Sequence, residues 1–324
     1  MRINTLYFKN VLHPRVIAYL QQLRSCIKMT RLDNRTIPNN SSEIRAFVCM
    51  RNEALRLPYF IEYYASKGVS RFFFIDNGST DGSVNIVLRY QNTHVFSTKE
   101  SYKRCMNWID ILLRRYSLNQ WALVVDVDEI FISPLLDKSS IAQTCAHLEL
   151  LGAHGLRCVL LDMYSDLQLS KINYQQGEDP LKYCPYFDSN YRSVTATAIN
   201  RRKLKEYQSK VFIGGMRERI FGSDNWISKI PLFFNTKNTS ISLGAHTISE
   251  CQLATCQGAL LHFKFFSDFL ERVPDEVLRA EHCNSAGEYK KYLLSLDPAL
   301  IFFDSNSQRY SEPKSLIDAG VMIA

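Results

Sequence analysis

The strongest constraint on the fold is the alternation of short apolar runs with helix-like segments over residues 44–126. The first run, IRAFVCM at 44–50, has the length of a buried strand, and helical spacing of apolar residues separates each run from the next. We expect strands at 44–50, 71–75, 93–97 and 121–126, and helices at 58–68, 83–91 and 101–116. Such alternation predicts an α/β fold, with a parallel sheet and helices on both faces.

The second half of the chain is predicted to be less regular. A helix is expected near 137–151, and strands near 155–161, 193–199, 210–213, 230–234 and 258–266. Two further helices are expected at 268–280 and 288–296. We therefore divide the chain into an N-terminal arm and linker (1–42), a main domain (43–270, with halves 43–135 and 136–270) and a helical extension (271–324).

Composition excludes several classes of protein. A chain of 324 residues with 46% hydrophobic and 22% charged residues can bury a large core. Mean hydropathy is −0.17, and no run reaches the roughly 18 uncharged apolar residues that a membrane-spanning helix needs. We expect neither a cleaved signal peptide nor a spanning helix. Nine scattered cysteines without a CxxC pair predict reduced thiols and a cytoplasmic location.

Positive charge is concentrated at the N-terminus. Residues 1–35 hold seven Lys and Arg and one Asp, a local net charge of 7 − 1 = +6, within a total of +7. Helical spacing of Ile17, Leu20, Leu23 and Ile27 predicts an amphipathic segment. We favour a helix that packs this stripe on the main domain; the alternative is peripheral contact with an anionic membrane at its inner face. Nucleic acid is not an expected partner, because no aromatic-studded basic surface follows.

Polar side chains follow three of the predicted strands. They are Arg51-Asn52-Glu53 after 44–50, Asp76-Asn77 after 71–75, and Asp126-Val127-Asp128-Glu129 after 121–126. In parallel sheets, ligands collect beyond the carboxyl ends of the strands. The sequence therefore predicts a binding site at this edge of the sheet.

The acidic cluster in WALVVDVDEIFI calls for a compensating charge. Asp126 and Asp128, two residues apart in extended chain, would point to the same side. Carboxylates that face each other near a core raise one another's pKa and are costly unless a cation or strong hydrogen bonds compensate. Hard oxygen ligands suit Mg²⁺ or Mn²⁺. The alternative is a strand end whose acids cap a helix or pair with arginine.

Two segments in this order, VCMRNEALRLPYFIEYYASKGVSRFFFIDNGSTDGS and WALVVDVDEIF, resemble the glycosyltransferase family 2-like group. The branch concerned carries R-N-E, D-N-x-S-T-D and D-x-D-E motifs. The strong matches cover 44–132, and weaker ones continue through 214–219 and 260–265 to about residue 270. The resemblance implies a GT-A fold: a mostly parallel sheet flanked by helices, with an irregular α+β second half. It also implies sugar transfer from a nucleotide diphosphate to an acceptor hydroxyl, usually with inversion.

The resemblance also assigns roles to individual residues. It implies donor contacts at Asn52, Glu53, Asp76, Asn107 and Asp126. It implies that Asp126 and Asp128 bind Mn²⁺ or Mg²⁺, and that a late histidine completes the site. His262 is preferred over His246 for this last position, and a satisfied core histidine remains the alternative for both.

A diphosphate that leaves a sugar develops negative charge, which a metal and cationic side chains can stabilise. Candidates for the cationic role are Arg217, Arg219 and Lys229. If GGMRERIFG is extended, both arginines lie on one side, opposite Glu218. The alternative is a structural Arg–Glu network. Inversion needs a general base near the acceptor hydroxyl; Glu218 is the leading candidate, with two alternatives, Asp188 and Asp224.

The predicted function is an inverting, metal-dependent glycosyltransferase of hexosyl type, active in glycan or polysaccharide synthesis. Its expected partners are a nucleotide-sugar donor and a glycan, lipid-linked or protein acceptor. A sugar-phosphate nucleotidyltransferase is an alternative, but it would carry a glycine-rich phosphate loop after the first strand, and residues 51–55 contain no glycine. A catalytically inactive carbohydrate-binding or scaffold protein is the other alternative.

Overall fold

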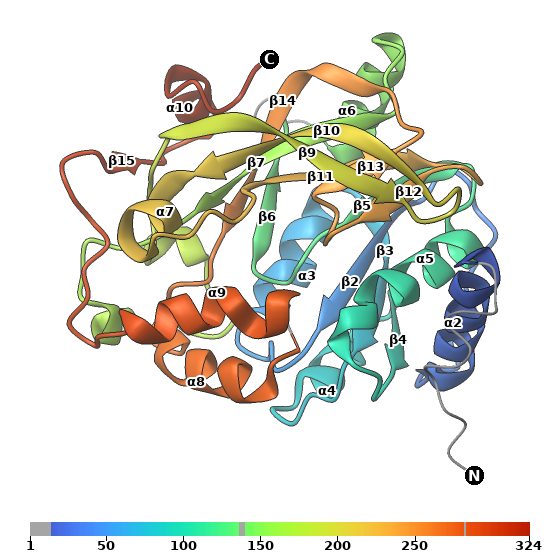
Figure 1. The fold of residues 1–324 in the computed structure, drawn as a ribbon, viewed down its shortest axis with the longest axis horizontal. Coiled ribbons are helices and arrows are strands. Elements are labelled where there is room, and N and C mark those ends of the chain that lie inside the picture. The colour runs from blue at the N-terminus through green and yellow to red at the C-terminus, as the bar shows by residue number, and fades with distance from the viewer. Residues whose placement is uncertain (1–13, 136–139, 282) are drawn as a thin grey trace.

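The computed structural model describes residues 14–135, 140–281 and 283–324 (Figure 1). A central sheet is built from β1 (Thr30–Arg31), β2 (Ile44–Met50), β3 (Val69–Asp76), β4 (Thr93–Ser97), β5 (Gln120–Val124), β6 (Glu129–Ile132), β7 (Gly155–Asp162), β11 (Ser228–Asn235) and β14 (Leu253–His262). Within the described residues its order is β1-β4-β3-β2-β5-β11-β7-β14-β6.

The pairing directions define the fold class. Strands β4, β3, β2, β5, β7 and β14 run in one direction, and β1, β11 and β6 run in the other. The sheet is therefore mixed but mostly parallel. The predicted α/β class is confirmed, and the arrangement is consistent with a GT-A-like, Rossmann-type fold.

Smaller elements surround this sheet. Three two-stranded units pair β9 (Tyr191–Asn200) with β10 (Lys205–Gly214), β12 (Ser240–Ser242) with β13 (Thr247–Ser249), and β8 (Tyr186–Phe187) with β15 (Gln308–Arg309). The α-helices in the described ranges are α2 (Pro14–Lys28), α3 (Leu57–Ser66), α4 (Ser83–Val87), α5 (Cys105–Tyr116), α6 (Ile141–Leu150), α7 (Gly215–Phe221), α8 (Phe269–Arg279), α9 (Cys283–Leu294) and α10 (Pro313–Asp318). Figure 1 shows α8 and α9 side by side.

Strand β2 shows why the sheet is covered on both faces. All seven of its residues are buried, so its apolar run serves two cores. Ala46 and Val48 belong to the core that includes α3, and Phe47 belongs to the core that includes Trp108 and Leu112 of α5. Alternate side chains of a strand point to opposite faces. The run at 44–50, apolar at every position except Arg45, is therefore the pattern of a strand buried on both faces.

The N-terminal segment is attached to this sheet through residues after α2. β1 pairs antiparallel with β4, and the carboxylate of Asp33 accepts a hydrogen bond from Val95 N at 2.9 Å. The Arg35 guanidinium donates to the carbonyl oxygen of Thr93 at 3.0 Å. The predicted linker at 33–42 is thus bound to the main domain at its start. Residues 1–13 of the predicted arm lie outside the described residues.

Two other predictions concern membranes and thiols. None of the described helices is long and apolar enough to cross a bilayer. The eight cysteines whose side chains are described, which exclude Cys283, are free thiols. The helix predicted near 137–151 is observed as α6, and the first part of that range, 137–139, lies outside the described residues.

Candidate active site at the carboxyl ends of the strands

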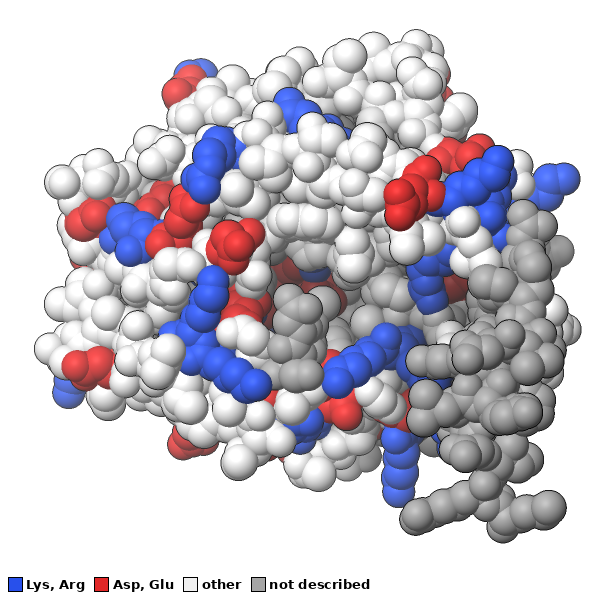
Figure 2. Space-filling model, in the orientation of Figure 1, with Lys and Arg blue, Asp and Glu red and all other residues white. Residues whose placement is uncertain are grey.

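The carboxyl ends of the parallel strands gather most of the predicted site residues. Strand register places His262 of β14 opposite Asp162 of β7 on one side and opposite Glu129 of β6 on the other. Figure 2 shows a hollow near the middle of this face, with acidic side chains inside it and lysine and arginine side chains around its edge. Parallel pairing of β2 with β3 and with β5 brings the loops after these three strands to the same edge, as predicted.

The local geometry of the acidic cluster differs from the prediction. Strand β5 ends at Val124 and β6 begins at Glu129, so Asp126 and Asp128 lie in the connecting turn, not in extended chain. Glu129 N donates to Asp126 O at 3.1 Å and closes this turn. The alternation of side chains along a strand therefore does not apply to the two aspartates. They take different partners.

Lys229 of β11 balances the negative charges of Asp126 and Glu129. Its ammonium group donates to Asp126 Oδ2 at 2.6 Å and to Glu129 Oε1. Burial raises the pKa of Glu129 above its ordinary value, although the charge of Lys229 opposes this. Burial would lower the pKa of Lys229, but the two carboxylates outweigh it and raise that pKa. The Asp126 side chain is 46% exposed and is the member of the trio that faces solvent.

His262 contacts the remaining aspartate of the cluster, Asp128, and also Asp162 of β7. Its Nε2 lies 3.3 Å from Asp128 Oδ2, and its Nδ1 lies 2.7 Å from Asp162 Oδ1. Burial would raise the pKa of Asp128, but the charge of His262 and its hydrogen bond hold that pKa well below its ordinary value. Burial would also lower the pKa of His262, but the two aspartates outweigh it, and the pKa is raised. The carboxylates are thus balanced by an imidazole and a lysine.

Arg217 extends this network away from the turn. Its Nε donates to Asp162 Oδ2 at 2.7 Å, and its Nη1 donates to Glu288 Oε1 of α9 at 2.8 Å. The segment that carries it is helix α7, so GGMRERIFG does not meet the condition of an extended chain, on which the shared side of Arg217 and Arg219 depended. Gly214 and Gly215, at the junction of β10 and α7, have positive φ values of 129° and 70°, which glycine adopts readily.

These contacts test whether the residues fit a divalent cation. In the described part of the chain, no three His, Cys, Asp or Glu side chains are arranged to hold a metal ion. Asp128 and His262 form a pair of donors, and Asp162 holds His262 Nδ1 so that Nε2 faces Asp128. A carboxylate behind the histidine is the usual support of a metal-binding imidazole. Mg²⁺ sites keep several waters and use substrate phosphates, so a site with two protein ligands would need water and phosphate oxygens to complete the coordination.

The loops after β2 and β3 hold each other in place. Asn52 adopts a left-handed backbone, φ 54°, and its Oδ1 accepts from Thr80 N at 2.8 Å. The Asp76 carboxylate accepts from Ser79 N at 3.0 Å and from Gly78 N at 3.2 Å. Both predicted donor-binding side chains therefore lie at the expected edge, and both organise the loop at 76–82.

Helix α8 brings arginines to the same edge. Arg272 donates to Glu53 Oε1 at 2.6 Å, and Arg279 donates to Asn77 Oδ1 at 2.6 Å. Burial raises the pKa of Glu53 above its ordinary value, although Arg272 and Arg56 oppose this. The C-terminal extension, to which the sequence assigned no chemistry, thus closes one side of the site.

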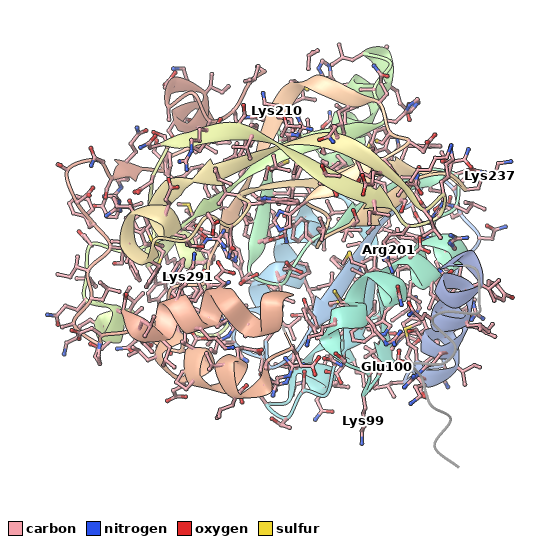
Figure 3. All side chains as sticks on the ribbon, in the orientation of Figure 1. Lys99, Glu100, Arg201, Lys210, Lys237 and Lys291 are labelled. Carbon is pink, nitrogen blue, oxygen red and sulfur yellow. The ribbon has the colours of Figure 1, made fainter. Side chains whose placement is uncertain are left out.

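Asn107 takes a partner that the sequence did not indicate. This buried residue of α5 accepts a hydrogen bond from Arg201, which follows β9. Figure 3 labels Arg201 beside α5. Burial lowers the pKa of Arg201, although Asp110 opposes this. A guanidinium that is largely buried against a neutral amide is suited to an anionic ligand.

The other predicted residues on and near α7 make ion pairs. Glu218 accepts two hydrogen bonds from Arg192, both at 2.7 Å, and this interaction lowers the pKa of Glu218. Arg219 donates to Asp188 at 2.7 Å. These contacts are those expected of a structural network, the alternative raised for Arg217 and Arg219.

Asp224, an alternative general base, and His246, the alternative late metal ligand, also have partners. Asp224 accepts from Lys291 of α9 at 3.2 Å, and Figure 3 shows Lys291 between α7 and α9. His246 Nδ1 lies 2.6 Å from the carbonyl oxygen of Ser228, and burial lowers the pKa of His246 to about 4. A neutral imidazole bonded to backbone is a satisfied core residue. His246 takes no part in the Asp128–His262 pair.

Sequence reasoning missed three functional candidates: Arg201, Arg272 and Glu288. Each comes from an element far from the acidic cluster in sequence, and no motif surrounds it. One weak signal was present in the sequence: Arg272 and Arg279 lie seven residues apart and therefore on one face of a predicted helix.

Comparisons with known proteins give fold-level likeness alone. No family model matches the chain, and no curated protein matches it. Among solved structures, one similar chain is a protein assigned as a glucose-1-phosphate thymidylyltransferase from Bacillus anthracis, solved with sucrose. It is 11% identical with a TM-score of 0.26. The match covers 42% of this chain and 65% of that one, slightly less than two thirds of its length.

A second similar structure is a 4-diphosphocytidyl-2C-methyl-D-erythritol synthase. It is also 11% identical, with a TM-score of 0.29, and the match covers 88% of this chain and 99% of that one. Both TM-scores are below 0.5. Neither likeness therefore supports an inference about the reaction of this chain, and the functional argument depends on the site.

Proposed function

We propose that this chain is an inverting, metal-dependent glycosyltransferase that moves a sugar from a nucleotide-diphosphate donor to an acceptor hydroxyl. The observation that carries the proposal is the pair Asp128–His262, supported by Asp162, at the carboxyl ends of parallel strands. Ligands of open α/β sheets bind at this edge. The acceptor class is a glycan, a lipid-linked sugar or a protein, in keeping with a role in glycan or polysaccharide synthesis.

The proposed metal site uses Asp128 and His262. Asp126, which the resemblance also assigned to the metal, is paired with Lys229 instead. Bound Mn²⁺ or Mg²⁺ would supply positive charge to the diphosphate as it leaves the sugar. Asp162 orients the imidazole of His262, and Arg217 holds Asp162 through its other oxygen. Lys229 fixes Asp126 at 2.6 Å and adds a second positive charge near the acidic turn. These residues form a preorganised set of charges, as transition-state stabilisation requires.

The proposed donor-binding residues lie around this turn. Asn52, Glu53 and Asp76 belong to the loops after β2 and β3, where the nucleoside would bind. Arg201 and Asn107 would contact the diphosphate, because Arg201 is a cation paired with a neutral amide. Arg217 and Arg219, which the sequence also indicated, would act through the carboxylates that they hold.

Glu218 is the proposed general base. Its carboxylate is held by Arg192, which lowers its pKa and weakens it as a base. In this role Glu218 would exchange Arg192 for the acceptor hydroxyl. The Glu218→Gln protein should bind the donor normally and lose at least roughly 100-fold in transfer, the usual size of a general-base effect. Donor affinity by calorimetry and transfer by product analysis measure the two quantities separately.

Two comparisons make this test specific. Arg192→Ala releases Glu218 and should retain transfer, since it removes an exposed partner and not the base. Thermal unfolding should change little in either variant, because exposed ion pairs contribute about 0–1 kcal/mol. Near wild-type transfer by Glu218→Gln rejects Glu218 as the general base. Asp188→Asn and Asp224→Asn then test the two alternatives.

The overall reaction class is tested by incubating the full chain with a panel of nucleotide sugars and Mn²⁺. Release of nucleoside diphosphate supports a glycosyltransferase. Exchange of radioactive pyrophosphate into the nucleotide sugar indicates a sugar-phosphate nucleotidyltransferase and contradicts the proposal. Binding with neither product also contradicts it and indicates a carbohydrate-binding protein.

A further inference from the structure

Helix α2 turns its apolar side chains toward solvent. Val16, Tyr19, Leu20, Leu23 and Ile27 recur at spacings of three and four residues and therefore share one face. Their exposed fractions range from 41% for Val16 to 77% for Ile27. The expectation that this stripe packs on the main domain is wrong for Leu20, Leu23 and Ile27. The side chain of Ile17 lies outside the described set.

The polar side of α2 contacts the protein instead. Ser25 is fully buried, and Gln22 Nε2 donates to Asp110 of α5 at 2.5 Å. Arg24 lies 3.5 Å from Glu100. Within the described part of the chain, these polar contacts hold the helix, and none of the five apolar side chains is buried. An exposed apolar face of this kind marks an interaction surface.

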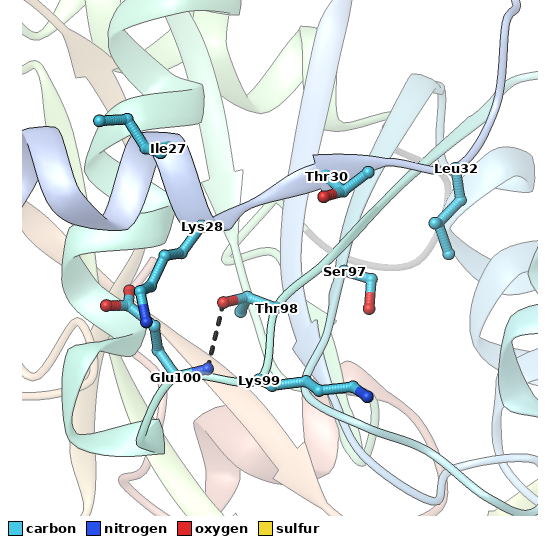
Figure 4. Close-up of a pocket in the computed structure, with 8 residues that line it drawn as sticks. All are labelled: Ile27, Lys28, Thr30, Leu32, Ser97, Thr98, Lys99 and Glu100. Atoms are coloured by element: carbon cyan, nitrogen blue, oxygen red, sulfur yellow. Dashed lines mark hydrogen bonds between the residues drawn. The ribbon is translucent and has the colours of Figure 1, made fainter.

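A cationic pocket lies at the end of this face. It is a cavity of about 400 Å³ between the end of α2, β1 and the end of β4 (Figure 4). Lys28 and Lys99 contribute positive charge, and the apolar side chains of Ile27 and Leu32 lie at the same place. The lining is completed by hydroxyls and one carboxylate: Thr30, Ser97, Thr98 and Glu100.

The carboxylate in the pocket does not cancel the two lysines. Glu100 accepts a hydrogen bond from Trp108 Nε1 at 3.2 Å and lies 3.5 Å from Arg24. Arg104 lies 3.9 Å away from the same carboxylate. Its charge is therefore shared with two arginines, so the surroundings of the pocket are cationic overall. They suit a phosphate group that enters beside an apolar surface.

We propose that the apolar face of α2 and this pocket dock on an anionic phospholipid membrane. Val16, Tyr19, Leu20, Leu23 and Ile27 would enter the interface between headgroups and acyl chains. Lys28 and Lys99 would pair with lipid phosphates, because an anionic membrane surface attracts cationic side chains. The net charge of +6 over residues 1–35 favours an anionic membrane over a neutral apolar partner.

Docking has a consequence for the candidate site. Thr98 N donates to Asp76 O at 3.0 Å, so the pocket lies at the same carboxyl edge as the predicted donor loops. A membrane at α2 would therefore lie next to the site. This consequence, which rests on the proposed function, favours a lipid-linked acceptor among the acceptor classes. Docking itself is independent of catalysis and is measured without a nucleotide sugar.

The test is co-sedimentation of the full chain with vesicles, either phosphatidylcholine alone or phosphatidylcholine mixed with phosphatidylglycerol. We expect binding to the mixed vesicles that weakens with added salt, and little binding to phosphatidylcholine. Leu23→Ser/Ile27→Ser and Lys28→Glu/Lys99→Glu should each reduce binding by roughly tenfold or more, from the apolar and charge contributions respectively. All four side chains are exposed, so thermal unfolding should be unchanged.

Matched controls lie elsewhere on the surface. Leu150 of α6 is 86% exposed, and Lys210 of β10 lies far from Lys99 in Figure 3. Leu150→Ser and Lys210→Glu should leave vesicle binding unchanged. Equal binding to both vesicle types, or full binding by either double variant, overturns the proposal. So does light scattering that shows a dimer which Leu23→Ser/Ile27→Ser dissociates, because the face then belongs to a second copy of this chain.

Discussion

The Asp128→Ala protein is expected to lose Mn²⁺-dependent binding of nucleoside diphosphates by at least roughly 100-fold, more than the 10–100-fold typical of a supporting residue. Asp128 is 9% exposed, and its carboxylate lies 3.3 Å from His262. This contact holds the carboxylate in place as one of the two proposed metal ligands. Without it, the cation would keep one protein ligand and the phosphates. Calorimetry with UDP, GDP, CDP and TDP, each with and without Mn²⁺, measures the loss.

Two further variants make this result interpretable. Asp162→Asn leaves both proposed ligands in place and removes the charge behind His262, so it should cost 10–100-fold, less than Asp128→Ala. Asp318→Ala removes an exposed carboxylate, paired with Lys314, and should have no effect. Thermal unfolding checks that each variant folds. Metal-dependent affinity that is unchanged in a folded Asp128→Ala protein would contradict the assignment of this pair.

The parts of the fold that the sequence predicted are those that local patterns determine. Strand β2 was predicted over the observed residues because IRAFVCM is apolar at every position except Arg45, and a strand buried on both faces is apolar along most of its length. The convergence of the loops after β2, β3 and β5 at one edge follows from parallel pairing. This is why the general position of the candidate site could be predicted without coordinates.

Local patterns did not determine the conformation of residues between the strands. DVDE was expected to be extended, but the chain turns at 125–128, and Asp126 and Asp128 take separate partners. The segment after Gly214, for which the consequences of an extended chain were considered, forms α7. In both places the side chains contact partners that are distant in sequence, namely Lys229, His262 and Asp162. The spacing of residues along the chain does not indicate these partners.

Long-range ion pairs were the least predictable part of the site. Arg272 and Glu53 are 219 residues apart in sequence, and no pattern near either residue indicates the other. The stripe on α2 shows the same limit in another form. Its periodicity predicts a helix with an apolar face, but periodicity alone does not show whether that face points toward the domain or away from it.

The Lys229→Met protein is expected to lose about 3–5 kcal/mol of unfolding free energy, the usual cost of breaking a buried ion pair by removing one partner. Lys229 is 5% exposed and Glu129 is 1% exposed, so the carboxylate of Glu129 would remain buried without its cation. Urea unfolding monitored by fluorescence measures the change. Lys203→Met, which removes the exposed partner of Glu250, should change stability by less than about 1 kcal/mol.

A double variant separates charge from packing at this position. In Lys229→Met/Glu129→Gln the uncompensated charge is gone, so most of the lost stability should return. Failure to recover any of it would show that packing of the Lys229 chain, not charge, accounts for the loss.

The stability of the single variant Lys229→Met should also depend on pH. Burial already raises the pKa of Glu129, and loss of Lys229 raises it further. Because the folded state then binds the proton more tightly than the unfolded state, stability falls as pH rises between the ordinary and the raised pKa. Lys229→Met should therefore be less destabilised at pH 5 than at pH 8, and Lys229→Met/Glu129→Gln should lack this difference.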